Sequence, residues 1–139
     1  MDPFIYNISF QQGIPFDFII SDWLNKNTGE YYDLSDGYTA RLVVRKFVGD
    51  TDPALFDLSS IGDTPQIKLY SRQIVSSFTT ANTQAMVPLD TYRPLYGSPD
   101  AAPKYQAGVY ELRVARAGVP YSVSVGDIFI TLGIITDNG

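Results

Sequence analysis

The sequence has 139 residues, of which 45% are hydrophobic and 18% are charged, with ten Lys and Arg against fifteen Asp and Glu and a net charge of −5. This apolar content excludes a disordered chain, and the acidic balance argues against a nucleic-acid partner, because such proteins carry a basic stripe. The chain has no cysteine and no histidine, which excludes disulfides and every Ser-His or Cys-His catalytic arrangement.

Alternating apolar residues predict strands from the start of the chain. The period of two runs from Phe4 to Phe10 and again from Phe16 to Ile20, with the turn residues 11–13 between them. Such alternation is typical of strands with one buried face. We expect the first run, residues 4–10, to be an edge strand that can pair with another chain.

A third strand is predicted from Tyr38 to Val44, after a polar turn at residues 25–29. Alternation turns Tyr38, Leu42 and their neighbours Ala40 and Val44 inward, and it turns the intervening arginines outward. A later strand, residues 109–114, has the same period. We expect its Tyr110 and Leu112 to pack against the third strand from the opposite sheet, about 10 Å away.

Two glycine-containing turns, a final strand and one short helix complete the predicted elements. Ala117-Gly118 and Gly126-Asp127 each predict a tight hairpin, since Gly supplies the positive φ of such turns. Apolar residues from Ile128 to Ile134 predict the final strand. Residues 79–86 are the one helical segment, and we expect Thr80 to cap it. Strand length and spacing together predict one all-β sandwich domain over residues 1–139.

A proline-rich segment, residues 88–104, interrupts the strand pattern. Proline donates no ladder hydrogen bond, so this segment is predicted to be a long loop. Aromatic residues framed by proline suit a contact surface, although the loop can equally cover one end of its own sandwich. Our candidate interface residues are those of this loop and of the first strand, namely Tyr92, Pro94, Leu95, Tyr96, Phe4 and Tyr6.

Carboxylate chemistry is weakly represented. Only two glutamates occur, Glu30 in a turn and Glu111 in a strand, and nearly all aspartates fall in turns. Phosphate-binding glycine loops and nucleophile elbows do not occur. We therefore expect no enzyme activity, no cofactor and no small-molecule substrate.

One acidic cluster leaves a calcium site open as an alternative. Its members lie within twelve residues and carry the oxygen ligands that Ca²⁺ takes. Their spacing does not match an EF-hand loop, and the same residues suit a polar hairpin turn. They are Asp22, Asn25, Asn27, Glu30 and Asp33.

The aromatic content, 14%, is high for so few charges. Such a composition is typical of protein interfaces, although a flat row of exposed rings would instead suit a carbohydrate-binding module. Trp23 follows a strand and is expected to fill the core. No basic residue precedes Lys26 and no apolar run approaches 20 residues, so we expect neither an export signal nor a membrane partner.

The order of several motifs resembles one protein family. The motifs are Q-G-x-x-F after the first strand, D-L-S-D-G-Y-T-A-R-L-V-V-R, an isoleucine strand, a T-x-x-T-x-x-M segment and G-x-Y-E-L-hydrophobic. They occupy residues 10–16, 33–45, 66–69, 80–86 and 108–114. This arrangement resembles the immunoglobulin-like N-terminal domain of phage baseplate upper proteins and of related tail or head-fibre attachment proteins.

The resemblance implies an all-β, immunoglobulin-like β-sandwich of seven or eight antiparallel strands with at most one short helix. It also implies a structural role within the virion, in a chain made in the host cytoplasm. The partners would be other phage structural proteins and copies of the chain itself in a symmetric assembly. An adaptor of the tail, neck or baseplate is the first expectation, and a head decoration or head-fibre base is the alternative.

Overall fold

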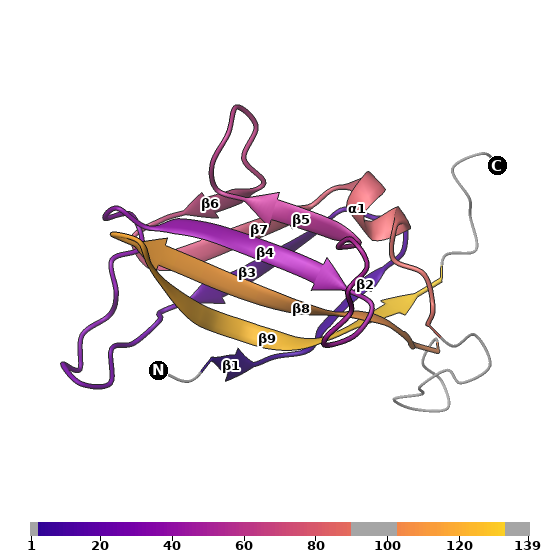
Figure 1. Cartoon of the computed structure of the whole chain (residues 1–139), viewed down its shortest axis with the longest axis horizontal. Helices are drawn as coiled ribbons and strands as arrows, with labels where there is room; N and C mark the ends of the chain where they lie inside the picture. The colour runs from indigo at the N-terminus through magenta and orange to yellow at the C-terminus, as the bar shows by residue number, and fades with distance from the viewer. Residues whose placement is uncertain (1–2, 90–102, 133–139) are drawn as a thin grey trace.

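The computed structural model describes residues 3–89 and 103–132 of the chain. These residues form nine strands and one short helix, and the strands make two sheets that pack on a shared core (Figure 1). The predicted all-β class is therefore confirmed. The candidate loop residues Tyr92, Pro94, Leu95 and Tyr96 lie outside the described residues, as does the chain after Leu132.

The larger sheet has six strands in the order β1-β9-β8-β4-β5, and β2 also pairs with β9. Along the order β9-β8-β4-β5, each strand runs antiparallel to the next. The long β8–β9 hairpin forms the centre of the sheet. The predicted turn Ala117-Gly118 joins this hairpin, with positive φ at both residues, as a tight two-residue turn requires. The strands are β1 Phe4–Ile5, β2 Ile8–Gln11, β4 Thr39–Arg45, β5 Phe56–Ser59, β8 Tyr105–Arg116 and β9 Val119–Thr131.

The smaller sheet has three antiparallel strands in the order β3-β7-β6. It lies behind the larger sheet in the view of Figure 1. Buried residues alternate with more exposed ones along β3 and β7, as expected for strands with one face on the core. These strands are β3 Phe16–Ser21, β6 Ile67–Leu69 and β7 Gln73–Phe78.

The prediction of seven or eight antiparallel strands is wrong at the N-terminus. The first apolar run is not one strand but two, β1 and β2, and both run parallel to β9. Phe4 lies opposite Ser124 and Gln11 lies opposite Thr131, so the two short strands keep one register along the edge of the larger sheet. We call residues 4–11 the N-terminal arm.

A second correction concerns Gly126-Asp127, which was predicted to be a hairpin turn. Instead, β9 continues through both residues. A Cβ atom at Gly126 would lie 2.1 Å from the carbonyl oxygen of Tyr6, much closer than any real contact. Glycine is therefore required here because the backbone of the arm passes close to Gly126, and not because the chain turns.

The pairing of the third predicted strand also differs from the expectation. Tyr110 and Leu112 lie on β8, which is hydrogen-bonded to β4 in the same sheet, with Leu112 directly opposite Leu42. They do not face β4 from the other sheet. Their inward orientation was predicted correctly, because Leu42, Tyr110 and Leu112 are all buried.

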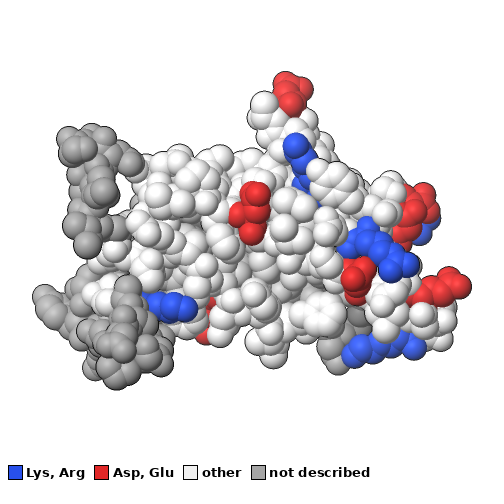
Figure 2. All heavy atoms as spheres, turned by 180° about the vertical axis from the view of Figure 1, so that it is seen from behind, with Lys and Arg blue, Asp and Glu red and all other residues white. Residues whose placement is uncertain are grey.

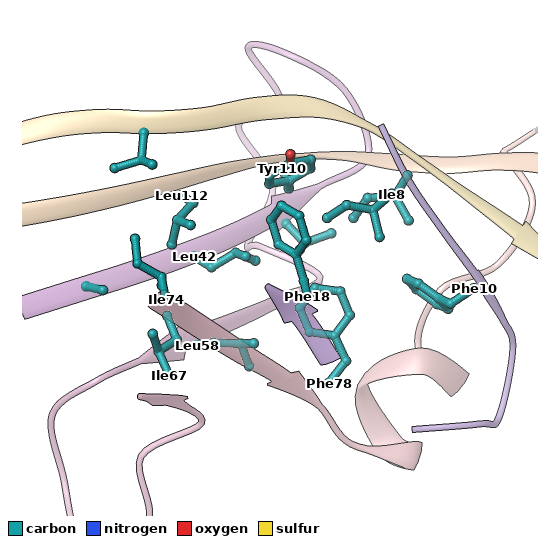
Figure 3. Packing of buried hydrophobic residues seen from close by; sticks show 14 of the residues in the cluster. Ile8, Phe10, Phe18, Leu42, Leu58, Ile67, Ile74, Phe78, Tyr110 and Leu112 are labelled. Atoms are coloured by element: carbon teal, nitrogen blue, oxygen red, sulfur yellow. The ribbon is translucent and has the colours of Figure 1, made fainter. Parts of the chain in front are cut away.

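The core between the sheets is rich in aromatic rings. Phe18 of β3 packs edge-on against Tyr110 of β8, with ring centroids 5.4 Å apart, and Phe78 of β7 packs edge-on against Phe10 of the arm at 5.7 Å. Figure 3 shows these rings between the two sheets, among the aliphatic side chains. Trp23 is buried, as predicted.

Helix α1, Thr80–Gln84, is the predicted short helix, but its cap is Thr79 and not Thr80. The Thr79 hydroxyl accepts from the amide of Asn82 at 3.2 Å, and the Asn82 side chain accepts from the amide of Thr79 at 2.9 Å. Two adjacent threonines left the choice open in the sequence, and the reciprocal pair with Asn82 three residues later decides it.

Candidate functional site

The N-terminal arm is held to β9 and β8 by backbone bonds and by two side chains. The amide of Tyr6 donates to the carbonyl of Val125 at 2.9 Å. The hydroxyl of Tyr110 donates to the carbonyl of Tyr6 at 2.6 Å, and the amide of Asp127 donates to the side-chain oxygen of Asn7 at 3.0 Å. The arm therefore stays attached across the break between β1 and β2, where regular strand pairing stops.

The beginning of the arm exposes apolar side chains. The exposed fractions are 49% for Phe4, 85% for Ile5 and 56% for Tyr6. The Tyr6 ring stacks on Phe18 with centroids 5.8 Å apart, so one face of it is covered. Both described candidate residues, Phe4 and Tyr6, thus lie on an edge of the larger sheet, as the predicted edge strand required.

A groove on the outer face of the larger sheet lies beside the arm. Its volume is about 630 Å³, and its floor is formed by Val43, Val109 and Val125 of the three central strands. Val125 is also the residue opposite Ile5 of the arm. At the end of β4, the exposed Phe47 and Val48 form the rim. We call this hollow the outer groove.

Most charged side chains around the outer groove are paired with one another. Arg41 forms a bidentate ion pair with Asp57, and this hydrogen bonding raises the pKa of Arg41 above its ordinary value. Glu111 accepts from Arg113 at 2.9 Å and from the Ser122 hydroxyl at 2.8 Å. Such pairs are suited to a binding surface more than to acid–base chemistry, because neither carboxylate is held as an isolated proton acceptor.

Outward-facing valines are the signal in the sequence that could have identified the groove. Val43, Val109 and Val125 alternate with the buried residues of their strands, where a solvent-facing strand position is usually polar. The alternation predicts the core residues, and the same strands carry these apolar residues on the other face. Strand pairing was also needed, since only the sheet order brings the three valines together.

The side chains considered for calcium instead make local hydrogen bonds and an ion pair. Asp33 accepts from both the amide and the hydroxyl of Ser35, and these bonds lower the pKa of Asp33. Asn25 accepts from the amide of Asn27 at 3.0 Å, and Asp22 lies 3.7 Å from Arg72. Within residues 3–89 and 103–132, no three acidic side chains gather in a way that would hold a metal ion.

A second, smaller hollow, with a volume of about 510 Å³, lies beside this turn. The exposed Tyr31 ring forms part of its lining, and the Arg72 guanidinium lies 4.3 Å from the ring centroid.

Seen from the side opposite to Figure 1, the charged side chains gather mainly toward one end of the molecule, and the broad middle of that face is almost free of them (Figure 2).

No protein-family model matches the chain, and no curated protein matches it. The single helix of the described residues is also too short to cross a membrane.

Proposed function

We propose that this protein is a structural component of a phage particle, a small adaptor of the tail, neck or baseplate that binds other virion proteins. The observation that carries the proposal is the exposed apolar start of the arm, with Phe4 and Ile5, lying next to the outer groove. An apolar centre with few unpaired charges is the composition of a protein-binding surface. The order of motifs in the sequence points to the phage family.

The sheet arrangement supports the immunoglobulin-like part of the proposal. In such sandwiches one sheet holds the first, second, fourth and fifth strands of the fold, and the other holds the third, sixth and seventh. The order β3-β7-β6 against β9-β8-β4 matches this scheme except for the first strand, which has no counterpart in the smaller sheet within the described residues, and β5 is an added edge strand. The parallel arm beside β9 then precedes the first strand of the smaller sheet.

The experiment is a quantitative mass-spectrometric count of the protein in purified phage particles. We expect a fixed number of copies per particle, small for a tail, neck or baseplate adaptor and large for a head decoration. Ile5→Asp places a charge in the exposed start of the arm and is expected to reduce incorporation about tenfold. Ile61→Asp, at another exposed site in the loop between β5 and β6, is the matched control and is expected to be incorporated normally.

Two results would contradict the proposal in different ways. Absence of the wild-type protein from particles would exclude a virion role. Equal incorporation of the two variants would leave the virion role standing but move the contact surface away from the arm.

A carbohydrate-binding module is the alternative from another class of function, and the exposed Tyr31 ring beside Arg72 favours it. Sugars stack on such rings, and charged side chains around the hollow supply hydrogen bonds. Glycan binding by the isolated protein that is lost in Tyr31→Ala, together with absence from particles, would replace the adaptor with this module.

A further inference from the structure

We propose that the N-terminal arm exchanges between two copies of the chain, so that each arm pairs with β9 of the other copy. The partner is a second copy because the site that holds the arm is shaped for this one segment. The inference concerns the chain alone and does not depend on a virion role. Exchange of an identical element is a low-cost route to a dimer, since each contact made within one chain is made again between chains.

The arm is a separable unit of the fold. Its strand pairing, within the described residues, is with β9 alone, and it runs parallel to β9 in an otherwise antiparallel sheet. Its two core side chains, Ile8 and Phe10, enter the sandwich from the edge. Removing the arm therefore opens one edge of the larger sheet and leaves the pairing of the other strands in place.

The site that receives the arm is specific to it. Gly126 leaves the space through which the carbonyl of Tyr6 passes, and the hydroxyl of Tyr110 donates to that same carbonyl. Asn7 accepts from the backbone just beyond this point. Another apolar strand would have to match the glycine, the tyrosine hydroxyl and the two core side chains at one register. The arm of a second copy matches all of them.

The connection between β2 and β3 provides the hinge. It consists of residues 12–15, and Gly13 has a φ of +84° that directs the chain from one sheet to the other. Pro15 restricts Ile14 to extended conformations, which are also the conformations of an opened connection. Fully extended, four residues span about 14 Å, enough to carry the arm away from its own β9. Short connections of this kind favour exchange.

The test uses the absence of native cysteine. Gln11 and Thr131 lie opposite each other on the arm and β9, so Gln11→Cys with Thr131→Cys allows one disulfide between the two strands. After oxidation at high protein concentration, we expect a band of doubled mass on a denaturing, non-reducing gel. Peptide mapping of that band should find the disulfide joining position 11 to position 131.

The matched control is Thr39→Cys with Ala115→Cys, a facing pair on β4 and β8 that stays within one chain in either arrangement. This control is expected to give only the monomer band. If the arm pair also gives only monomer, with its disulfide formed, the arm closes on its own chain and the proposal is overturned.

A second measurement covers the case in which the cysteine variants fail to fold. Native mass spectrometry of the unmodified protein, mixed from isotopically labelled and unlabelled samples, should show mixed dimers that increase with concentration. Gly126→Ala fills the space needed by the arm in either chain and is expected to abolish these dimers. A wild-type protein that stays monomeric at every concentration, or mixed dimers that persist in Gly126→Ala, would overturn the proposal.

Discussion

Two buried serines differ in their hydrogen bonding. Ser76 of β7 is fully buried, and its hydroxyl has no hydrogen-bond partner among the described residues. Ser124 of β9 is equally buried, but its hydroxyl lies 2.7 Å from the hydroxyl of Tyr110. Tyr110 uses its one hydrogen for the carbonyl of Tyr6, so Ser124 is the donor of the pair.

This contrast predicts opposite effects of the same substitution. Ser76→Ala removes a desolvated hydroxyl that gains nothing in the fold, and we expect it to raise the free energy of unfolding by about 1 kcal/mol. Ser124→Ala removes a formed hydrogen bond and should lower that free energy by about 1 kcal/mol. Urea unfolding of the two variants beside the wild type measures both changes. Destabilisation by Ser76→Ala would mean that its hydroxyl has a partner.

Tyr110 makes stability depend on alkaline pH. Burial raises its pKa from an ordinary value of 10.0 to about 12, although the bond from Ser124 acts in the opposite direction. Between pH 10 and 12 the unfolded chain loses this proton and the folded protein retains it. The folded state therefore binds more protons, and the contribution of Tyr110 to stability, complete below pH 10, is lost as the pH rises toward 12.

Tyr110→Phe isolates this contribution. The variant keeps the ring in the core but has no proton to lose, so its stability should fall less steeply than that of the wild type as the pH is raised above 10. It should also be less stable at neutral pH, because the bond to Tyr6 is gone. Urea unfolding midpoints at a series of pH values provide the comparison. Equal slopes for both proteins would show that other groups cause the alkaline loss.

Helix α1 allows a test at the scale of one element. Thr79→Ala removes the capping hydroxyl that accepts from Asn82, and we expect a loss of about 1 kcal/mol in the free energy of unfolding. Thr80→Ala is the matched control. The backbone carbonyl of Thr80 accepts a hydrogen bond from the hydroxyl of Thr83, and alanine keeps this carbonyl. A larger loss of unfolding free energy for Thr80→Ala than for Thr79→Ala would show that Thr80 caps the helix, as expected from the sequence.

Strand faces were predictable from sequence, and strand partners were not. Leu42 follows Arg41 and Tyr110 precedes Glu111, and the period of two in their strands turns both residues inward. Whether they belong to one sheet or to facing sheets depends on pairing, which periodicity does not encode. Gly126 shows the same limit, since the sequence alone does not distinguish a glycine in a turn from a glycine that allows a neighbouring backbone to approach closely.

The candidate site was predictable to a similar extent. Phe4 and Tyr6 were expected on an edge strand. Phe4 lies on the edge strand β1, and Tyr6 lies in the break between β1 and β2. The outer groove was missed, since it exists only after β4, β8 and β9 are placed side by side. The interface role of either surface remains a prediction.

At the scale of the whole molecule, the single-domain prediction has a direct test. Trp23 is buried and stacks on Tyr32 with ring centroids 4.3 Å apart. Its fluorescence therefore reports on packing, while far-ultraviolet circular dichroism reports on the strands of both sheets. We expect the two signals to change at the same urea concentration, in one transition. Separate midpoints would divide the chain into more than one cooperative unit.

The pairing of the arm with β9 has a consequence for how the protein is made. Translation delivers the arm well before its partner strand, so Ile8 and Phe10 leave the ribosome long before Ile128 and Ile130 arrive to cover them. Early segments of a chain commonly fold during synthesis, but this edge must wait. A product that terminates before β9 leaves Ile8 and Phe10 without the strand that they pair with, and exposed apolar surface of this kind makes a chain prone to aggregation. Closure of the arm therefore requires a chain that has been synthesised through β9.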